Sequence, residues 1–105
     1  MAYSNTARHG LLRMIISFKH KGLEKFFSTG STVGIQAKHA AKLQNQLTTL
    51  DSATTVQDMY FPNWHLHPLQ GNKEGYWAIR VNGNWRIIFK FEDGNAYIVD
   101  YLDYH

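Results

Sequence analysis

YWAIRVNGNWRIIFKFEDGNAYIVDYLDYH, residues 76–105, is the stretch that decides the fold. It contains three runs rich in β-branched and aromatic residues, 76–81, 85–91 and 96–102, which are typical of strands. Asn82-Gly83-Asn84 and Asp93-Gly94 separate them, and Asn-Gly and Asp-Gly between such runs are the strongest short-range signals of a β-hairpin. The stretch therefore predicts an antiparallel meander of three long strands.

The alternation of side chains decides how the first two strands pair, because successive residues point to opposite faces of a sheet. A two-residue loop would set apolar residues opposite charged ones and mix the faces. A three-residue loop over 82–84 pairs Val81 with Trp85. It also pairs Arg80 with Arg86, so the faces stay separate, and we predict this loop with a glycine or asparagine at positive φ.

One face of the predicted meander gathers positive charge. It presents Tyr76, Arg80, Arg86 and Lys90. Cations interleaved with an aromatic ring suit a nucleic-acid backbone with stacked bases. The competing interpretation is solubility, since the solvated faces of antiparallel sheets are often rich in Lys and Arg. On the residues alone, both interpretations stay open.

The last strand has two possible registers. A two-residue Asp93-Gly94 turn puts Tyr97, Val99, Tyr101 and Asp103 on the basic face. A slip of one residue puts Ile98, Asp100 and Leu102 there instead. We favour the first register, because it sets Tyr101 opposite Arg86 with Asp103 nearby.

Upstream of the meander the chain predicts a short strand and two helices. Met14–Phe18 is a β-rich run, and a short helix over 21–29 follows, with Gly30 as its stop. A second helix over 37–51 carries an apolar seam that we expect to pack on the sheet; its other side carries Lys38, Lys42, Gln44, Gln46 and Thr48. Thr54-Thr55-Val56-Gln57 matches a capping box and predicts a single turn near 55–59. A short strand over 65–69 contains Pro68, which favours a sheet edge.

Length and composition indicate one α+β domain. The 105 residues allow one modest core. The absence of cysteine excludes disulfides and thiolate metal sites and favours the cytoplasm. The apolar runs are far shorter than a membrane span needs. We expect residues 1–13 to be an extension and 14–105 to be the domain. Removing Arg8 and Arg13 from 11 Lys+Arg leaves 9 against 8 Asp+Glu, so the domain has a net charge of +1.

Acid–base groups collect near the end of the chain. Asp103, Tyr104 and His105 are residue types that donate, accept or relay protons. His65 and His67 share one face of their predicted strand and could form a metal pair, but without cysteine or an obvious third ligand we expect no metal. We expect the other histidines of the two predicted helices and their flanks, His20 and His39, to face solvent.

Several stretches in this order resemble a known family. They are MIISFKHKGL (14–23), Leu66-His67-Pro68-Leu69 with Gly71, Gly75-Tyr76-Trp77, Asn84-Trp85-Arg86-Ile87 and Asp103-Tyr104-His105. Over 14–105 the chain is similar to the HigB-type toxins of the RelE/ParE superfamily. The resemblance implies two N-terminal helices on a mainly antiparallel sheet. It also supports Met14 as the start of the family-like region.

The resemblance implies a ribosome-dependent mRNA endoribonuclease of a type II toxin–antitoxin system, without a cofactor. It implies a HigA-type helix-turn-helix antitoxin, mRNA and the ribosome with its rRNA as partners, and operator DNA bound only through the antitoxin. Family roles at matching positions suggest the catalytic residues His67, Arg86, Asp103, Tyr104 and His105. For RNA binding we add Lys19, Lys21, Lys73, Tyr76, Arg80 and Lys90. Gln70 stands where relatives often have Lys, and Asn82 where some have Arg.

RNA can be cleaved by its own 2′-hydroxyl if a base, an acid and a cation are positioned around the phosphate. We expect His67 and either His105 or Asp103 to share the acid and base roles, with Arg86 on the phosphate and Tyr104 orienting or stacking on the substrate. Two other functions stay open: a ParE-like, non-enzymatic inhibitor of DNA gyrase, and a nucleic-acid-binding module without catalysis. The acid–base terminus favours the nuclease.

Overall fold

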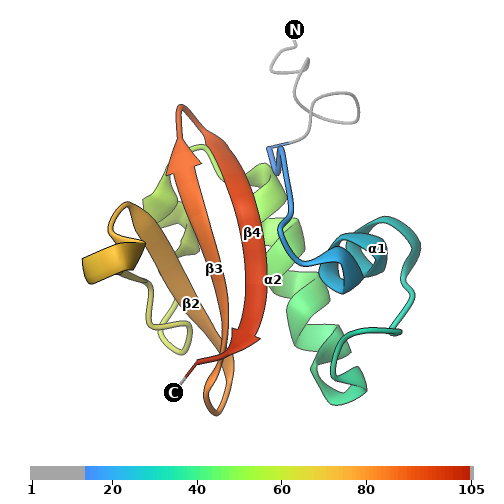
Figure 1. Cartoon of the computed structure of the whole chain (residues 1–105). Helices are drawn as coiled ribbons and strands as arrows, with labels where there is room; N and C mark the ends of the chain where they lie inside the picture. The colour runs from blue at the N-terminus through green and yellow to red at the C-terminus, as the bar shows by residue number, and fades with distance from the viewer. Residues whose placement is uncertain (1–13, 105) are drawn as a thin grey trace, which may run out of the picture.

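Residues 14–104 form two α-helices and a four-stranded sheet (Figure 1). The computed structural model describes residues 14–104, so the predicted extension 1–13 and His105 lie outside the described residues. The helices are α1 (Lys21–Thr29) and α2 (Ala40–Ser52), with the short 3-10 turns η1 (Ala37–His39), η2 (Val56–Met59) and η3 (Gly71–Lys73). The strands are β1 (His67–Pro68), β2 (Tyr76–Asn82), β3 (Trp85–Glu92) and β4 (Asn95–Asp103). This confirms the predicted α+β fold.

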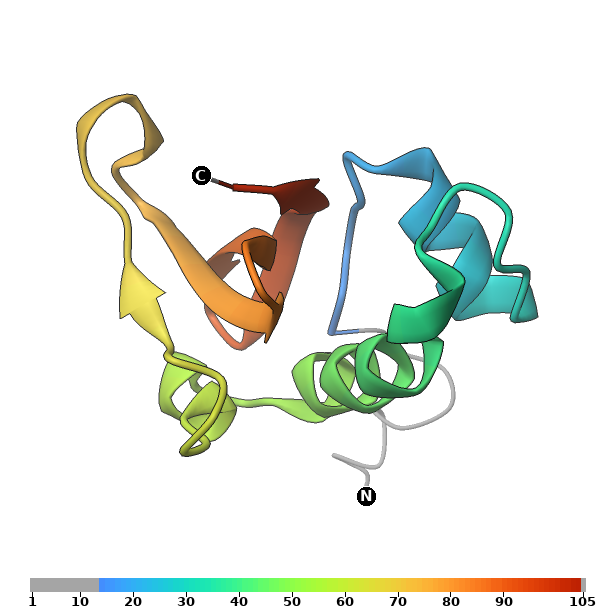
Figure 2. The same ribbon diagram turned by 90° about the horizontal axis from the view of Figure 1, so that it is seen from below.

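The sheet is antiparallel throughout, in the order β1-β2-β3-β4. Figure 2 shows α2 along one face of the sheet and α1 beyond its β4 edge. β1 forms the opposite edge, as Pro68 predicts, because proline has no N–H to give to a further strand. The other face of the sheet carries no α-helix within residues 14–104 (Figure 2), but the segment that contains Leu69 and η3 packs over part of it.

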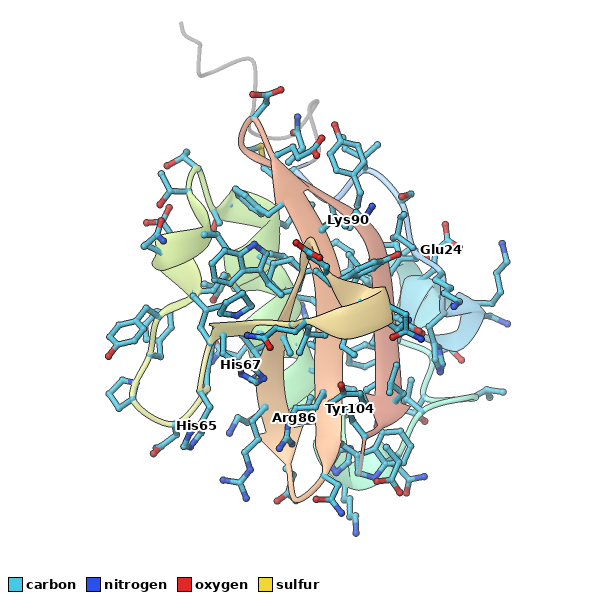
Figure 3. All side chains as sticks on the ribbon, turned by 60° about the vertical axis from the view of Figure 1, so that its left-hand side comes forward. Glu24, His65, His67, Arg86, Lys90 and Tyr104 are labelled. Atoms are coloured by element: carbon cyan, nitrogen blue, oxygen red, sulfur yellow. The ribbon has the colours of Figure 1, made fainter. Side chains whose placement is uncertain are left out.

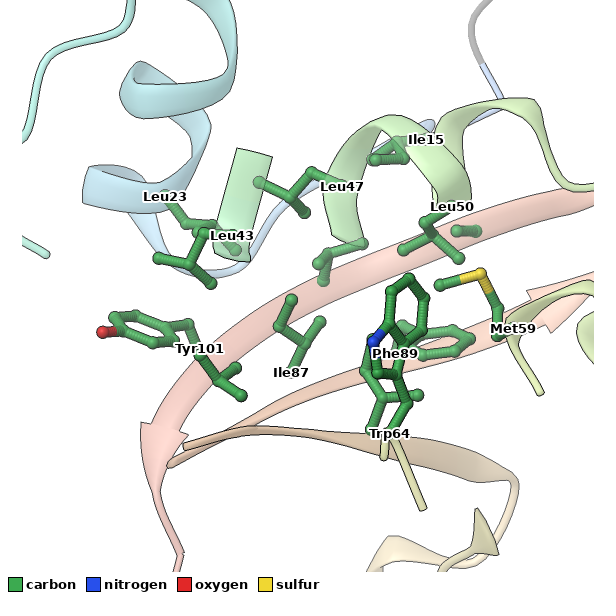
Figure 4. Packing of buried hydrophobic residues seen from close by; sticks show 14 of the residues in the cluster. Ile15, Leu23, Leu43, Leu47, Leu50, Met59, Trp64, Ile87, Phe89 and Tyr101 are labelled. Carbon is green, nitrogen blue, oxygen red and sulfur yellow. The ribbon is translucent and has the colours of Figure 1, made fainter. Parts of the chain in front are cut away.

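The core fills the space between α2 and the sheet (Figure 4). The predicted seam of α2 is confirmed, since Leu43, Leu47 and Leu50 are fully buried there. Burying a leucine side chain contributes roughly 1.5–3 kcal/mol, so this seam dominates the attachment of α2. Gln46, expected on the polar side, is also buried; its amide donates to the Arg80 carbonyl over 2.8 Å.

The helix predicted over 21–29 is confirmed, and the single turn predicted near 55–59 is found at Val56–Met59. α1 ends at Gly30, whose φ of 84° lets its N–H bond the Phe26 carbonyl. The capping box of η2 uses Thr55 and Asp58 rather than the expected Thr54 and Gln57. The Asp58 carboxylate accepts the backbone N–H groups of Thr54 and Thr55 over 2.9 and 3.2 Å.

A bulge shapes the β2–β3 hairpin. The predicted pairing of Arg80 with Arg86 is confirmed, but Trp85 lies opposite Asn82 rather than Val81. Val81 is an extra residue on β2 that remains buried in the core. Gly83 has a φ of 57°, as the turn requires, so the hairpin combines a tight turn with unmixed faces.

A second bulge overturns the favoured register of β4. Tyr97 lies opposite Lys90 as expected, but Ile98 and Val99 both lie opposite Phe89, and Ile98 has a φ of 54°. Beyond this bulge the faces are exchanged: Leu102 lies opposite Arg86, and Tyr101 lies in the core. The favoured contact between Tyr101 and Arg86 is therefore wrong.

The predicted first strand supplies the reason for this bulge. Residues 14–18 form two isolated parallel bridges with β4, Ile15 to Ala96 and Phe18 to Val99. Between them the Ser17 hydroxyl accepts the Ile98 N–H over 2.9 Å, and the Ser17 carbonyl accepts the Val99 N–H over 3.0 Å. These long-range bonds hold β4 in the bulged form.

Candidate active site

β1 brings His67 to the face of the sheet that carries no α-helix. His67 lies opposite Ala78, so its side chain shares the face that carries Arg80 and Arg86 (Figure 3). Its Nδ1 donates to the His65 carbonyl over 2.7 Å, which places the proton on Nδ1 and leaves the exposed Nε2 as the acceptor of the neutral ring. His65 has a φ of 51°, a rare conformation outside glycine, and it turns that carbonyl toward His67. The hydrogen bond therefore fixes the orientation of the imidazole.

Arg80 and Arg86 form a pair of like charges across the hairpin. They lie directly opposite each other, and both guanidinium groups donate to the Gly83 carbonyl, over 3.3 and 2.8 Å. Burial, and secondly the charge of Arg80, lower the pKa of Arg86. Neither arginine forms an ion pair with a carboxylate within residues 14–104. Two unneutralised guanidinium groups held by one carbonyl are suited to bind a phosphate.

A second cationic group lies at the far end of the same face. Lys73 and Lys90 place their ammonium groups 5.2 and 5.1 Å from the ring centroid of Tyr76. The cation–π contacts occupy this ring, so the group offers charge rather than a free stacking surface. Between the two groups, Leu69 packs on Ala78 and Ile88, so the face expected to be one open basic surface is divided by an apolar cluster.

The end of β4 is divided between the two faces of the sheet. Asp103 pairs with Trp85, which places it on the helix side, away from Arg86. Tyr104 donates its N–H to the Asn84 carbonyl over 2.8 Å, and Figure 3 shows it at the end of the sheet where Arg86 lies. Of the predicted catalytic residues, the structure thus brings His67, Arg86 and Tyr104 to one end of the sheet; His105 lies outside the described residues.

Two predicted RNA contacts lie apart from this face. Lys19 and Lys21 are exposed at the start of α1, and the Lys19 N–H donates to Val99 at the outer edge of β4. That edge is opposite to β1 and His67. Lys19 and Lys21 therefore form a basic region separate from the face that carries His67.

His20 and His39 were both predicted to face solvent. His20 is half-buried, and its Nδ1 accepts the Leu23 N–H over 2.9 Å. For His39 the prediction is wrong. His39 is 2% exposed, and its Nδ1 lies 2.7 Å from the Tyr101 hydroxyl. Burial, and secondly Lys38, lower its pKa from the ordinary 6.5. The pattern missed this because the contact depends on the bulge that turns Tyr101 into the core.

Two general findings concern the part of the chain that the structure describes. Residues 14–104 contain no group of three or more His, Cys, Asp or Glu side chains that could hold a metal ion. None of the helices in that range is long and apolar enough to cross a membrane.

The helix pair, the antiparallel sheet and the cationic face define a RelE-like toxin fold. The family described as RelE-like toxin of type II toxin–antitoxin system HigB matches residues 16–105. The chain therefore belongs to the HigB-like toxins. Endoribonuclease HigB of Proteus vulgaris is 47% identical over 92 residues, covering 88% of this chain and all of that protein. Toxin HigB-1 of Vibrio cholerae serotype O1 is 35% identical over 94 residues, covering 88% of this chain and 98% of its own length.

Proposed function

We propose that this HigB-family toxin is a ribosome-dependent endoribonuclease that cleaves translated mRNA. The observation that carries the proposal is the pair Arg80 and Arg86, unneutralised by any carboxylate within residues 14–104, on the same face as the exposed His67, whose Nδ1 is bonded to the His65 carbonyl. The Proteus vulgaris relative, named an endoribonuclease, supports the same activity.

In this proposal the 2′-hydroxyl of the RNA attacks the adjacent phosphorus. His67 Nε2 takes the 2′-proton as the general base, and the guanidinium of Arg86 stabilises the negative charge of the phosphorane. The 5′-oxygen leaves with a proton from a general acid, and the products are a 2′,3′-cyclic phosphate and a 5′-hydroxyl. Because Asp103 lies on the other face from Arg86, we assign the acid to His105.

The remaining cations are proposed to hold the mRNA and the ribosome. Arg80 binds the scissile or a neighbouring phosphate beside Arg86, and the group formed by Lys73, Tyr76 and Lys90 binds a phosphate further along the strand. Tyr104, which is 41% exposed, orients or stacks on the substrate. Lys19 and Lys21 lie on a different part of the surface and are proposed to contact rRNA.

A type II system pairs its toxin with an antitoxin. We propose a HigA-type helix-turn-helix antitoxin, with operator DNA bound only through it, and action in the cytoplasm, where translated mRNA is found. The neighbouring reading frame is the direct test of the antitoxin type, and a small helix-turn-helix protein is expected there.

The activity itself is tested by primer extension on mRNA incubated with the toxin, with and without translating ribosomes. We expect cuts within the translated region when ribosomes are present and none on free RNA. Cell arrest with intact mRNA and inhibited DNA supercoiling would instead indicate the ParE-like gyrase inhibitor. Binding to RNA without any cut would indicate a non-catalytic module.

The base is tested with His67→Gln, which keeps a polar side chain but removes the imidazole that is proposed to take the 2′-proton. We expect the cleavage rate to fall about 10²- to 10⁴-fold, the usual contribution of a general base. Lys25→Gln, on the exposed side of α1, is the matched control and should cleave at the wild-type rate. A His67→Gln variant with full activity would remove His67 from the mechanism.

A further inference from the structure

A buried hydrogen bond joins the start of α2 to the last strand. His39, at the junction of η1 and α2, is 2% exposed, and Tyr101 on β4 is 3% exposed. The His39 Nδ1 and the Tyr101 hydroxyl oxygen are 2.7 Å apart. The same oxygen accepts the backbone N–H of Gln36 over 3.3 Å. The bond spans 62 residues of chain and belongs to no part of the catalytic scheme above.

The Gln36 contact decides which partner donates. Of the two groups that contact the phenol oxygen within residues 14–104, the Gln36 N–H can only donate, so His39 Nδ1 is the partner that can accept the phenol hydrogen. His39 must then be neutral, because a protonated imidazole is a donor at both nitrogens. Burial lowers the pKa of His39 and raises that of Tyr101, so both groups favour their neutral forms.

The groups that face His39 are mostly aromatic. Its ring meets the edges of Trp85 and Tyr101 at centroid distances of 5.7 and 6.1 Å. Lys38 is its neighbour in η1, and His20, which caps α1, packs edge-on against Tyr101 at 5.4 Å. Asp103 follows on the same face of β4. Trp85 and Tyr101 are stacked at 4.6 Å, so the three rings form one packed unit.

This unit lies directly behind the candidate active site. Trp85 precedes Arg86, and Tyr101 precedes Leu102, which lies opposite Arg86. Successive side chains along a strand point to opposite faces, so Trp85 and Arg86 are carried by adjacent backbone positions. A shift of Trp85 or Tyr101 in the core therefore moves the backbone that orients Arg86. The hydrogen bond from the Tyr104 N–H to the Asn84 carbonyl also connects the end of β4 to the residue that precedes Trp85.

We propose that His39 is a positioning residue, which through Tyr101 and Trp85 holds Arg86 and the end of β4 in the geometry that RNA cleavage requires. The inference rests on the proposed endoribonuclease function and adds a residue from outside the candidate site to it. His39 touches no substrate in this scheme.

Three variants test the contact by activity. Tyr101→Phe removes the donated hydrogen, His39→Leu removes the acceptor, and His39→Asn keeps an acceptor oxygen near the position of Nδ1 without a titrating ring. A misplacement of about 1 Å costs roughly 10²-fold in rate, so we expect the first two to lower the maximal single-turnover rate at least about 10-fold. The half-saturating toxin concentration should stay within about twofold, since the groups that bind RNA remain. His39→Asn should cleave at nearly the wild-type rate.

The double variant His39→Leu/Tyr101→Phe should cleave no more slowly than the slower of the two single variants, because each single substitution already removes the same hydrogen bond. Tyr60→Phe is the matched control for loss of a phenol hydroxyl, since Tyr60 is 75% exposed. Folding of each variant is checked by its thermal unfolding.

A direct readout is the nitrogen-15 spectrum of the His39 ring. We expect the proton on Nε2 and a bare Nδ1 at neutral pH, and a changed Nδ1 signal in Tyr101→Phe. Because folding lowers the His39 pKa below 6.5, the unfolded chain binds the proton more readily. The stability contributed by this group is complete above about pH 6.5 and declines as the pH falls from there through the lowered pKa. His39→Asn should remove that decline.

A folded Tyr101→Phe that cleaves at the wild-type rate, or a His39 protonated at Nδ1 at neutral pH, would overturn the inference while leaving the proposed function intact. A wild-type protein that cleaves no translated mRNA would overturn the proposed function and the inference together. The two failures are therefore distinguishable.

Discussion

The two hairpins of the sheet use different two-residue turns and place their bulges differently: both Asp93 and Gly94 have a positive φ, whereas in Gly83-Asn84 only the glycine does. Each has a glycine at positive φ in its turn, and each has a bulge. In β2–β3 the bulge at Val81 lies beside the turn, and Arg80 still faces Arg86. In β3–β4 the bulge at Ile98 lies in mid-strand and exchanges the faces of every later residue. The position of a bulge, rather than its presence, decides which side chains reach the site.

The largest effect is expected where the first hairpin presents its cations. Arg86→Ala should reduce cleavage about 10²- to 10³-fold, because it removes the donor proposed to stabilise the phosphorane. Primer extension on translated mRNA measures the loss. Lys25→Ala, an equal loss of charge on α1, should leave cleavage unchanged. Equal cleavage by Arg86→Ala and the control would show that the arginine pair has no catalytic role.

The two turn glycines provide the next comparison. Gly83→Ala and Gly94→Ala place a Cβ at φ values of 57° and 78°, and each should lower the unfolding free energy by about 1–2 kcal/mol. Only the first should also slow cleavage, since the Gly83 carbonyl holds both arginines. Urea unfolding and cleavage assays on both variants separate the effects. Equal cleavage rates in the pair would contradict the role of this carbonyl.

The second hairpin can be weakened from outside the sheet. Ser17→Ala removes the hydroxyl that accepts the Ile98 N–H and should lower the unfolding free energy by about 1 kcal/mol. Ser52→Ala is the matched control, because that exposed hydroxyl bonds carbonyls of its own helix and should change stability little. A Ser17→Ala variant as stable as the control would show that other contacts maintain the bulge.

The smallest expected effect has opposite signs for stability and function. Arg80→Gln relieves the repulsion between directly opposed like charges and should raise the unfolding free energy by a few tenths of a kcal/mol. It should also weaken RNA binding and reduce its dependence on salt concentration by about one unit of slope. Urea unfolding and a salt titration of binding measure the two changes. A loss of stability would mean that the shared Gly83 carbonyl more than offsets the repulsion.

Much of the fold and part of the site could be predicted, because those features follow from local sequence. The helix over 21–29, the three long strands and the pairing of Arg80 with Arg86 depend on glycine positions and on residue alternation. His67 could be singled out before the structure was known, since its stretch resembles the family. Its orientation by the carbonyl of His65 could not, because no residue pattern predicts a positive φ at that histidine.

By itself, the sequence determined the α+β class, the edge strand with Pro68 and the cationic face of the first hairpin. The tertiary structure alone decided that Ile98 is bulged, that Asp103 faces away from Arg86, and that His39 is buried against Tyr101. These features depend on contacts between distant segments, such as Ser17 with Ile98, 81 residues apart. Turn and alternation signals act over a few residues, whereas a bulge or a buried polar pair is stabilised by whatever the rest of the fold packs against it.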